Sequence, residues 1–287
     1  AVLGAIPIRP EAAPNRDGNQ ALPGTLPAHD WRGFVPADLL PALRDPGAGF
    51  VLSANHRPVG AFYPLPLGLS TGSMGDTMRS WRLRERLTAK DSLSPADVLD
   101  VHHDPVNPAR RELVRLGLHL RATRPDGLSP DTRRALEVLE PWLKAGASSD
   151  LSVAGADLAT RISTFFRFVA TPLAFTFGGG ESGLARFLKD SARRIDANPK
   201  ADFGADELAF VDSVLADAWR DQQDATGQAR GMPGGGRRLG WFDSLDGFGS
   251  LDGSEDLPVP GITCLDGQTL KSQAGQSYTQ WVPLHDV

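Results

Sequence analysis

The stretch "SPADVLDVHHDPVNPARREL", residues 94–113, decides the fold class of the middle of the chain because it contains two helix-start signals. Ser94 and Asn107 each precede a proline, which is the pattern of an N-cap residue followed by proline at the first helical position. There the missing proline N–H costs no hydrogen bond. The same pattern recurs in "SPDT", where Ser129 precedes Pro130. The repeated signals predict a run of helices.

Apolar residues farther along the chain recur at the spacing of one helix face. The first such set is Leu158, Ile162, Phe165, Phe166 and Val169, and the second is Leu208, Val211, Leu215, Ala218 and Trp219. We interpret both sets as stripes that face a core, not as cofactor sites. The glycine-rich "FGGGESG" at residues 177–183 separates two helices of this predicted region.

The two ends of the chain have a different pattern. Short apolar runs at 2–8 and 50–54 lie among prolines and glycines, and "QSYTQWVPL" at 276–284 alternates like a strand. We therefore predict an α+β domain with strands at both ends and a mainly helical middle. Its predicted parts are a strand and loop part at 1–74, a helical part at 75–225, and a loop with a returning strand at 226–287, all within a single domain 1–287.

Composition excludes several classes of function. The formal charge is -5, so the basic excess expected of a protein that binds nucleic acid or an anionic membrane is missing. A single cysteine, Cys264, excludes an internal disulfide and a two-cysteine metal site. Apolar stretches such as "FRFVATPLAFTF" (166–177) fall short of the ~20 residues of a membrane span. Because the chain opens on a strand-like run without Met, we expect it to be an internal part of a longer protein.

The sequence "GLSTG" at 68–72 fits the nucleophile-elbow pattern, in which a serine stands on a tight turn between a buried strand and a helix. Its candidate nucleophile is Ser70. The preceding "AFYPLPL" contains two prolines, however, which a central sheet strand does not tolerate. A serine esterase therefore remains only an alternative.

The sequence "HHD" at 102–104 places two histidines beside a carboxylate. Adjacent residues point in different directions, and no further histidine or carboxylate stands at ligand spacing. We predict a surface or helix-end role here and no metal site. The glycine runs at 178 and 234 lack the "GK[ST]" of a phosphate-binding loop, so we predict flexible connectors.

Several motifs, taken in order, resemble the penicillin amidase (penicillin acylase) family of N-terminal-nucleophile hydrolases. They are "GAIPIRP" (4–10), "HDWRGFVPADLLP" (29–41), "RDPGAGFVLSANHRP" (44–58), "GDTMRSWRLRERL" (75–87) and "LSPADVLDVHHDPVNPARRELVRL" (93–116). The resemblance is strong to about residue 145 and loose after 225. It implies part of the αββα N-terminal-nucleophile hydrolase fold and a position in the central part of a β chain.

The resemblance also implies a mechanism. Family members cleave linear amides through an acyl-enzyme on an N-terminal serine, whose own α-amine acts as the base. The tetrahedral intermediate needs donors aimed at its oxyanion. In the family one donor is the amide of an asparagine that ends a strand, and Asn55 stands at the matching position. The family arginine on the next helix corresponds to Arg79, with Arg82 as the competing alignment. From the residues alone, Asn55 is a turn cap and Arg79 part of a surface ion pair.

Three departures from the family pattern accompany this resemblance. His56 stands where a second asparagine is usual. Family members commonly bind calcium through an aspartate, whereas this sequence has Gly68 or its neighbours there, so we expect no cofactor. The first residue, Ala1, has no nucleophilic side chain, so we expect the nucleophile to lie outside this chain and the chain alone to be inactive.

The resemblance implies a hydrolase made as a precursor, whose partners are the α chain and the remainder of the β chain. The expected substrates are penicillin or cephalosporin side chains or N-acyl homoserine lactones, which relate the family to antibiotic chemistry and quorum quenching. The implied location is periplasmic or secreted. The alternatives are a non-catalytic relative that acts as a binding domain, and an esterase that uses Ser70.

Overall fold

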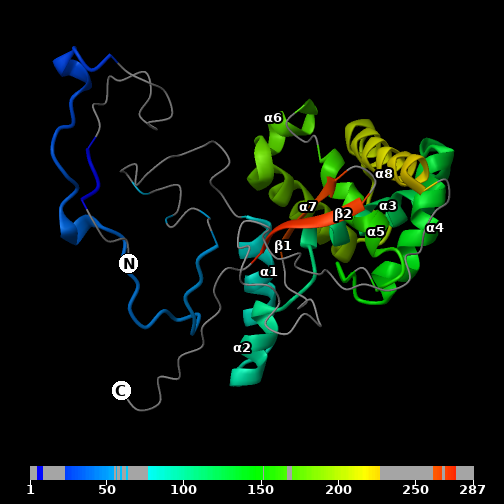
Figure 1. The fold of residues 1–287 in the computed structure, drawn as a ribbon, viewed down its shortest axis with the longest axis horizontal. Helices are drawn as coiled ribbons and strands as arrows, with labels where there is room; N and C mark the ends of the chain where they lie inside the picture. The colour runs from blue at the N-terminus through cyan, green and yellow to red at the C-terminus, as the bar shows by residue number, and fades with distance from the viewer. Residues whose placement is uncertain are drawn as a thin grey trace, which may run out of the picture.

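The structure is a computed structural model of the chain. It describes residues 5–8, 23–54, 56, 59, 63, 77–150, 152–166, 170–226, 261–266 and 269–275. Helices gather into one body, while the described N-terminal residues, drawn in blue, follow an extended course beside it (Figure 1). The mainly helical middle predicted from the sequence is therefore confirmed.

The helices of the body, with their bounds, are α1 (Met78–Leu87), α2 (Pro95–His102), α3 (Pro108–Thr123), α4 (Pro130–Lys144), α5 (Ala156–Ile162), α6 (Leu173–Phe177), α7 (Gly180–Ala197) and α8 (Ala205–Thr226). Short 3₁₀ turns are η1 (Pro27–His29), η2 (Ala37–Leu39), η3 (Pro125–Gly127) and η4 (Ser163–Phe165). The strands are β1 (Gly261–Asp266) and β2 (Thr269–Gly275). Among the described helices, none is long and apolar enough to cross a membrane.

The predicted helix starts of α2, α3 and α4 are confirmed. The Ser94 hydroxyl accepts the Asp97 N–H at 3.2 Å, and the Ser129 hydroxyl accepts the Thr132 N–H at 3.3 Å. The Asn107 side chain accepts two backbone N–H groups, at 3.0 and 3.3 Å. Each cap replaces hydrogen bonds that the first helical turn cannot make within the helix.

Helix α3 lies at the centre of the body and contacts α4, α7 and α8. Its residues Leu113, Leu116 and Leu120 are fully buried. Gly117 lets the neighbours approach, because a Cβ there would lie 2.9 Å from a methyl of Leu215 and 3.0 Å from one of Leu136. A side chain at this position would therefore push α3 away from α4 and α8.

The two predicted apolar stripes have different outcomes. On α8, Val211, Leu215 and Ala218 are buried as predicted. The other stripe does not form one helix. Helix α5 ends at Ile162, the chain tightens into η4, and at Phe166 it leaves helical geometry with φ -67° and ψ 68°. Leu158 and Ile162, the first two members of this predicted stripe, are still buried in the core, and Val169 lies outside the described residues.

The ends of the chain differ from the prediction of strands. Near the N-terminus an isolated bridge pairs Pro7 with Phe34, and the Val35 N–H donates to the Ile6 carbonyl at 2.8 Å. Residues 50–54 form no strand, because no backbone ladder joins them to another described segment. β1 and β2 form an antiparallel hairpin, whereas the strand predicted at 276–284 lies outside the described residues. The αββα layers are thus not shown.

Candidate functional site

The predicted site residues fall on two neighbouring segments. Asn55 lies outside the described residues, as does Ser70, but the residues on either side of Asn55, Ala54 and His56, are described. Arg79 lies in the first turn of α1 and is exposed. The local geometry around Ala54 and the start of α1 therefore defines the candidate site.

A buried hydrogen bond joins these two segments. The Thr77 hydroxyl donates to the Ala54 carbonyl at 2.8 Å, and the same oxygen accepts the Ser80 N–H at 3.1 Å. The Ser80 hydroxyl in turn accepts the Thr77 N–H at 2.9 Å, which completes a capping box. Ala54, Thr77 and Ser80 are all buried. The end of the segment that leads into Asn55 is thus fixed to the start of α1.

The start of α1 is also attached to α7. The Met78 N–H, which has no acceptor within its own helix, donates to a carboxylate oxygen of Glu181 at 2.6 Å. Glu181 lies in the first turn of α7, where a negative charge is favourable. Trp81, one turn farther along α1, is buried in the core. The N-terminal turn of α1 therefore has a fixed position on the helical body.

His56 occupies the position where the family usually has a second asparagine. Its Nδ1 accepts the Ala54 N–H at 3.2 Å. A backbone N–H can only donate, so Nδ1 is unprotonated in this arrangement and the ring proton belongs to Nε2. His56 therefore keeps one donor, Nε2–H, while its Nδ1 accepts the Ala54 N–H.

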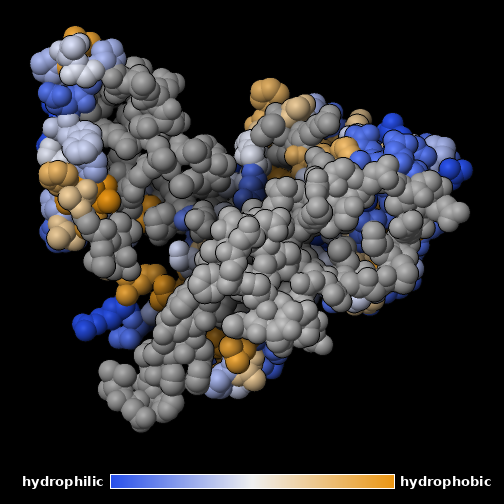
Figure 2. All heavy atoms as spheres, in the orientation of Figure 1, coloured by the Kyte–Doolittle hydropathy of each residue, from blue (hydrophilic) through white to orange (hydrophobic). Residues whose placement is uncertain are grey.

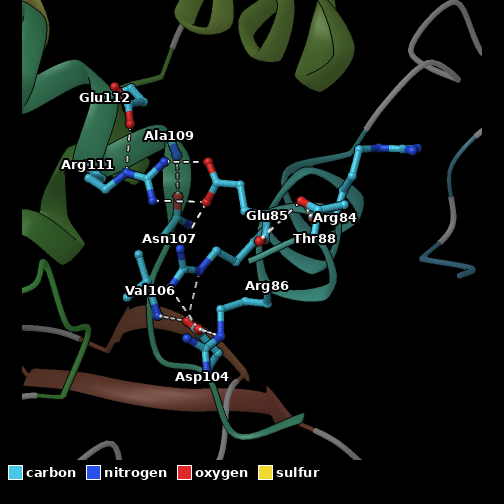
Figure 3. A network of polar contacts seen from close by, with 11 residues as sticks. Arg84, Glu85, Arg86, Thr88, Asp104, Val106, Asn107, Ala109, Arg111 and Glu112 are labelled. Atoms are coloured by element: carbon cyan, nitrogen blue, oxygen red, sulfur yellow. Dashed lines mark hydrogen bonds and ion pairs between the residues drawn. The ribbon is translucent and has the colours of Figure 1, made fainter. Parts of the chain in front are cut away.

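Arg82, the other residue that could match the family arginine, is fully engaged in ion pairs. Its Nε and Nη2 form a bidentate pair with Asp104 at 3.1 and 2.7 Å, and its Nη1 donates to Glu85 at 2.9 Å. Asp104 also pairs with Arg86 at 3.0 Å (Figure 3). These pairs use all three guanidinium nitrogens of Arg82.

The ion pairs of α1 continue onto α3. Glu85 accepts two donors of Arg111, one of them at 3.0 Å, and Arg111 Nε donates to Glu112 at 2.7 Å (Figure 3). Burial raises the pKa of Glu85, but the hydrogen bonds from Arg111 and Arg82 outweigh burial and hold its pKa below the ordinary value. The carboxylate is therefore ionised at neutral pH.

The same network reaches α7. Arg115 pairs with Glu112 at 3.5 Å and with Asp196 on α7. The hydrogen bond that Arg115 donates to Asp196 raises the pKa of Arg115 despite partial burial. Alternating charges thus join α1, α3 and α7, and hold the helix of Arg79 against the core.

The "HHD" sequence has two outcomes. His103 caps the end of α2, is exposed, and its Nδ1 lies 2.9 Å from the Leu99 carbonyl, so the predicted helix-end role is confirmed. Asp104, two residues beyond the end of α2, pairs with Arg82 and Arg86, and its side chain is 8% exposed. Arg82 and Arg86, spaced four residues apart on α1, were the sequence signal for an acidic partner.

The described residues contain no group of three or more acidic, histidine or cysteine side chains that could hold a metal ion. Gly68, the position matched to the family's calcium aspartate, offers no carboxylate and lies outside the described residues. The absence of a cofactor therefore stays a prediction.

Comparisons with known proteins agree with the motifs that define this site. The family model for penicillin amidase matches residues 1–282. Among curated proteins, the penicillin acylase 2 proenzyme of Pseudomonas sp. (strain SE83) is 30% identical over 117 residues. The match includes 39% of this chain and 15% of the relative, so the chain corresponds to a small part of that relative's length.

Proposed function

The chain belongs to the penicillin amidase family, and from this we propose that it forms part of an enzyme that hydrolyses linear amides. The family match along residues 1–282 is the observation that supports this proposal. The matched relative is a proenzyme, which supports production as a precursor and processing into chains.

The proposed reaction has two steps. A serine hydroxyl attacks the amide carbonyl and passes its proton to a base, the C–N bond breaks, and the leaving amine takes up the proton. Water then hydrolyses the acyl-enzyme and releases the carboxylic acid. We propose that the nucleophile is an N-terminal serine supplied by sequence outside these 287 residues.

Asn55 is the proposed oxyanion donor of this chain. Its side-chain amide would donate to the carbonyl oxygen as negative charge develops there, which stabilises the transition state more than the substrate. The bond from Thr77 to the Ala54 carbonyl supports this role, since it fixes the peptide group that leads into Asn55. A preorganised donor needs such a rigid support.

Arg79 is the proposed orienting residue. It stands two positions after Thr77, which brings its helix turn beside the end of the Asn55 segment. From there a guanidinium can donate charge-assisted hydrogen bonds to the asparagine side chain or to a substrate oxygen.

The proposed substrates are linear amides such as penicillin or cephalosporin side chains and N-acyl homoserine lactones. The proposed partners are an α chain and the remainder of a β chain from the same precursor, and the proposed location is periplasmic or secreted. These proposals rest on family membership alone.

The test is the Asn55→Ala variant of the full-length precursor, assayed for hydrolysis of a penicillin, a cephalosporin and an N-acyl homoserine lactone. Loss of one oxyanion donor typically lowers kcat about 10²–10³-fold, and we expect a fall of this size. Asn198→Ala is the matched control, because Asn198 is exposed at the end of α7 and should leave kcat unchanged.

Two other results would replace this proposal. An Asn55→Ala variant with wild-type kcat would show that Asn55 is not the oxyanion donor. A wild-type protein that hydrolyses none of the amides, yet is labelled at Ser70 by a serine-directed phosphonate, would identify an esterase instead.

A further inference from the structure

The Thr77 hydroxyl makes two hydrogen bonds with separate consequences. As an acceptor from the Ser80 N–H, at 3.1 Å, it caps α1. As a donor to the Ala54 carbonyl, at 2.8 Å, it makes a contact that capping does not require. The second bond spans 23 positions of sequence and joins the helical body to the segment that contains Asn55.

The carbonyl that Thr77 contacts belongs to the peptide group that joins Ala54 to Asn55. A peptide group is planar, so a hydrogen bond to the Ala54 carbonyl restrains the whole peptide group that leads on from Ala54. The Ala54 N–H is held as well, by Nδ1 of His56 at 3.2 Å. Both backbone polar groups of Ala54 are therefore hydrogen-bonded in a buried setting.

The other end of this contact is rigid. Thr77 is buried, its N–H bonds to Ser80, and the helix that it caps is held by Glu181 on α7 and by the ion pairs of Arg82. Residues 51–54, by contrast, make no backbone ladder with another described segment. Among the described residues, the bond from Thr77 therefore joins Ala54 to the helical body.

We propose that Thr77 is a positioning residue for the oxyanion donor, and that its hydroxyl proton, not its capping oxygen, fulfils this role. This inference rests on the proposed role of Asn55. A displacement of a catalytic group by about 1 Å can cost about 10²-fold in rate, so a single support of this kind is sufficient to affect turnover.

Three variants of the full-length protein separate the two roles of Thr77. Thr77→Ser keeps both hydrogen bonds, Thr77→Val removes both, and Thr77→Asp keeps a good N-cap acceptor but has no proton to donate at neutral pH. We expect Thr77→Asp to lower kcat about 10- to 100-fold with little change in KM, while Tm falls less than in Thr77→Val because the cap of α1 is kept. Thr77→Ser should retain the wild-type kcat, and Thr77→Val should lose both kcat and Tm.

A second measurement does not depend on activity. Amide hydrogen exchange at residues 51–56 should become about two- to tenfold faster in Thr77→Asp, because one buried hydrogen bond is lost, and should be unchanged in Thr77→Ser. Exchange at 51–56 that equals the wild-type rate in Thr77→Asp would overturn the proposal.

The outcomes also separate this inference from the proposed function. If Asn55→Ala abolishes turnover and Thr77→Asp does not, Thr77 is only a helix cap. If Asn55→Ala has no effect on turnover, Asn55 is not the oxyanion donor, and the proposal that Thr77 positions a donor fails with it. The exchange rates at 51–56 would then report only on the hydrogen bond from Thr77 to Ala54.

Discussion

The described residues before α1 (5–8, 23–54, 56, 59 and 63), here called the N-terminal segment, and the helical body of α1–α8 bury their apolar residues to very different extents. In the body, Leu116 is 0% exposed, and the core extends through helices α3, α4, α5, α7 and α8. In the segment, Leu43 is 69% exposed and Trp31 63%. Figure 2 shows orange, hydrophobic residues at the surface of this segment, where Figure 1 places the blue N-terminal residues.

This difference in burial shows which interactions stabilise each region. Burial of apolar surface stabilises the body. The described N-terminal residues are held by individual hydrogen bonds, such as the backbone bond from Val35 to Ile6 and the bond from the Thr77 hydroxyl to the Ala54 carbonyl. Ala54, which precedes the proposed oxyanion donor in the sequence, thus lies where one region meets the other.

The largest expected effect comes from Leu116→Ala in the body. Truncation of a fully buried leucine typically lowers the free energy of unfolding by about 2–5 kcal/mol, because apolar contacts are lost and a cavity remains. Urea unfolding of the chain, followed by helical circular dichroism, measures this change.

Leu43→Ala is the matched control for this comparison. The same truncation at an exposed position should change the free energy of unfolding by no more than about 0.5 kcal/mol. Equal effects at Leu43 and Leu116 would show that the segment belongs to the same cooperative core.

The helical body could be predicted largely from local sequence. The N-cap residues Ser94, Asn107 and Ser129 act within a few residues of themselves, so the sequence contains all the information that they need. The stripe on α8 was equally clear, since helix periodicity alone places its members on one face.

The rest of the fold depends on long-range contacts that a local pattern does not contain. The run at 50–54 looked like a strand, but a strand needs a hydrogen-bonding neighbour, and no described segment supplies one. The ion pairs of Asp104 were not predicted, because its partners Arg82 and Arg86 lie on another helix. The Thr77 contact to Ala54 was missed for the same reason.

An intermediate effect is expected for Glu85→Gln, which tests the ion pairs that hold α1 to the body. Loss of charge-assisted hydrogen bonds to Arg111 and Arg82 should lower the free energy of unfolding by about 1–2 kcal/mol at pH 7. Because the pKa of Glu85 is lowered on folding, its contribution is complete above the ordinary value of 4.5 and is lost as the pH falls through the folded pKa.

Urea unfolding from pH 7 to pH 3 tests this dependence. The difference between the wild type and Glu85→Gln should shrink as the solution becomes more acidic. A difference that stays constant down to pH 3 would contradict a role for the Glu85 charge and would leave packing of the side chain as the explanation.

The smallest expected effects come from a pair of hydroxyl deletions, one in each region. Ser129→Ala removes the cap of α4 and should lower the free energy of unfolding by about 1 kcal/mol. Tyr63→Phe removes an exposed hydrogen bond from the Tyr63 hydroxyl to the Leu39 carbonyl, and should change it by less than about 0.5 kcal/mol. Urea unfolding measures both. An effect of Tyr63→Phe as large as that of Ser129→Ala would show that the N-terminal segment unfolds together with the body, and that single hydrogen bonds there add to global stability.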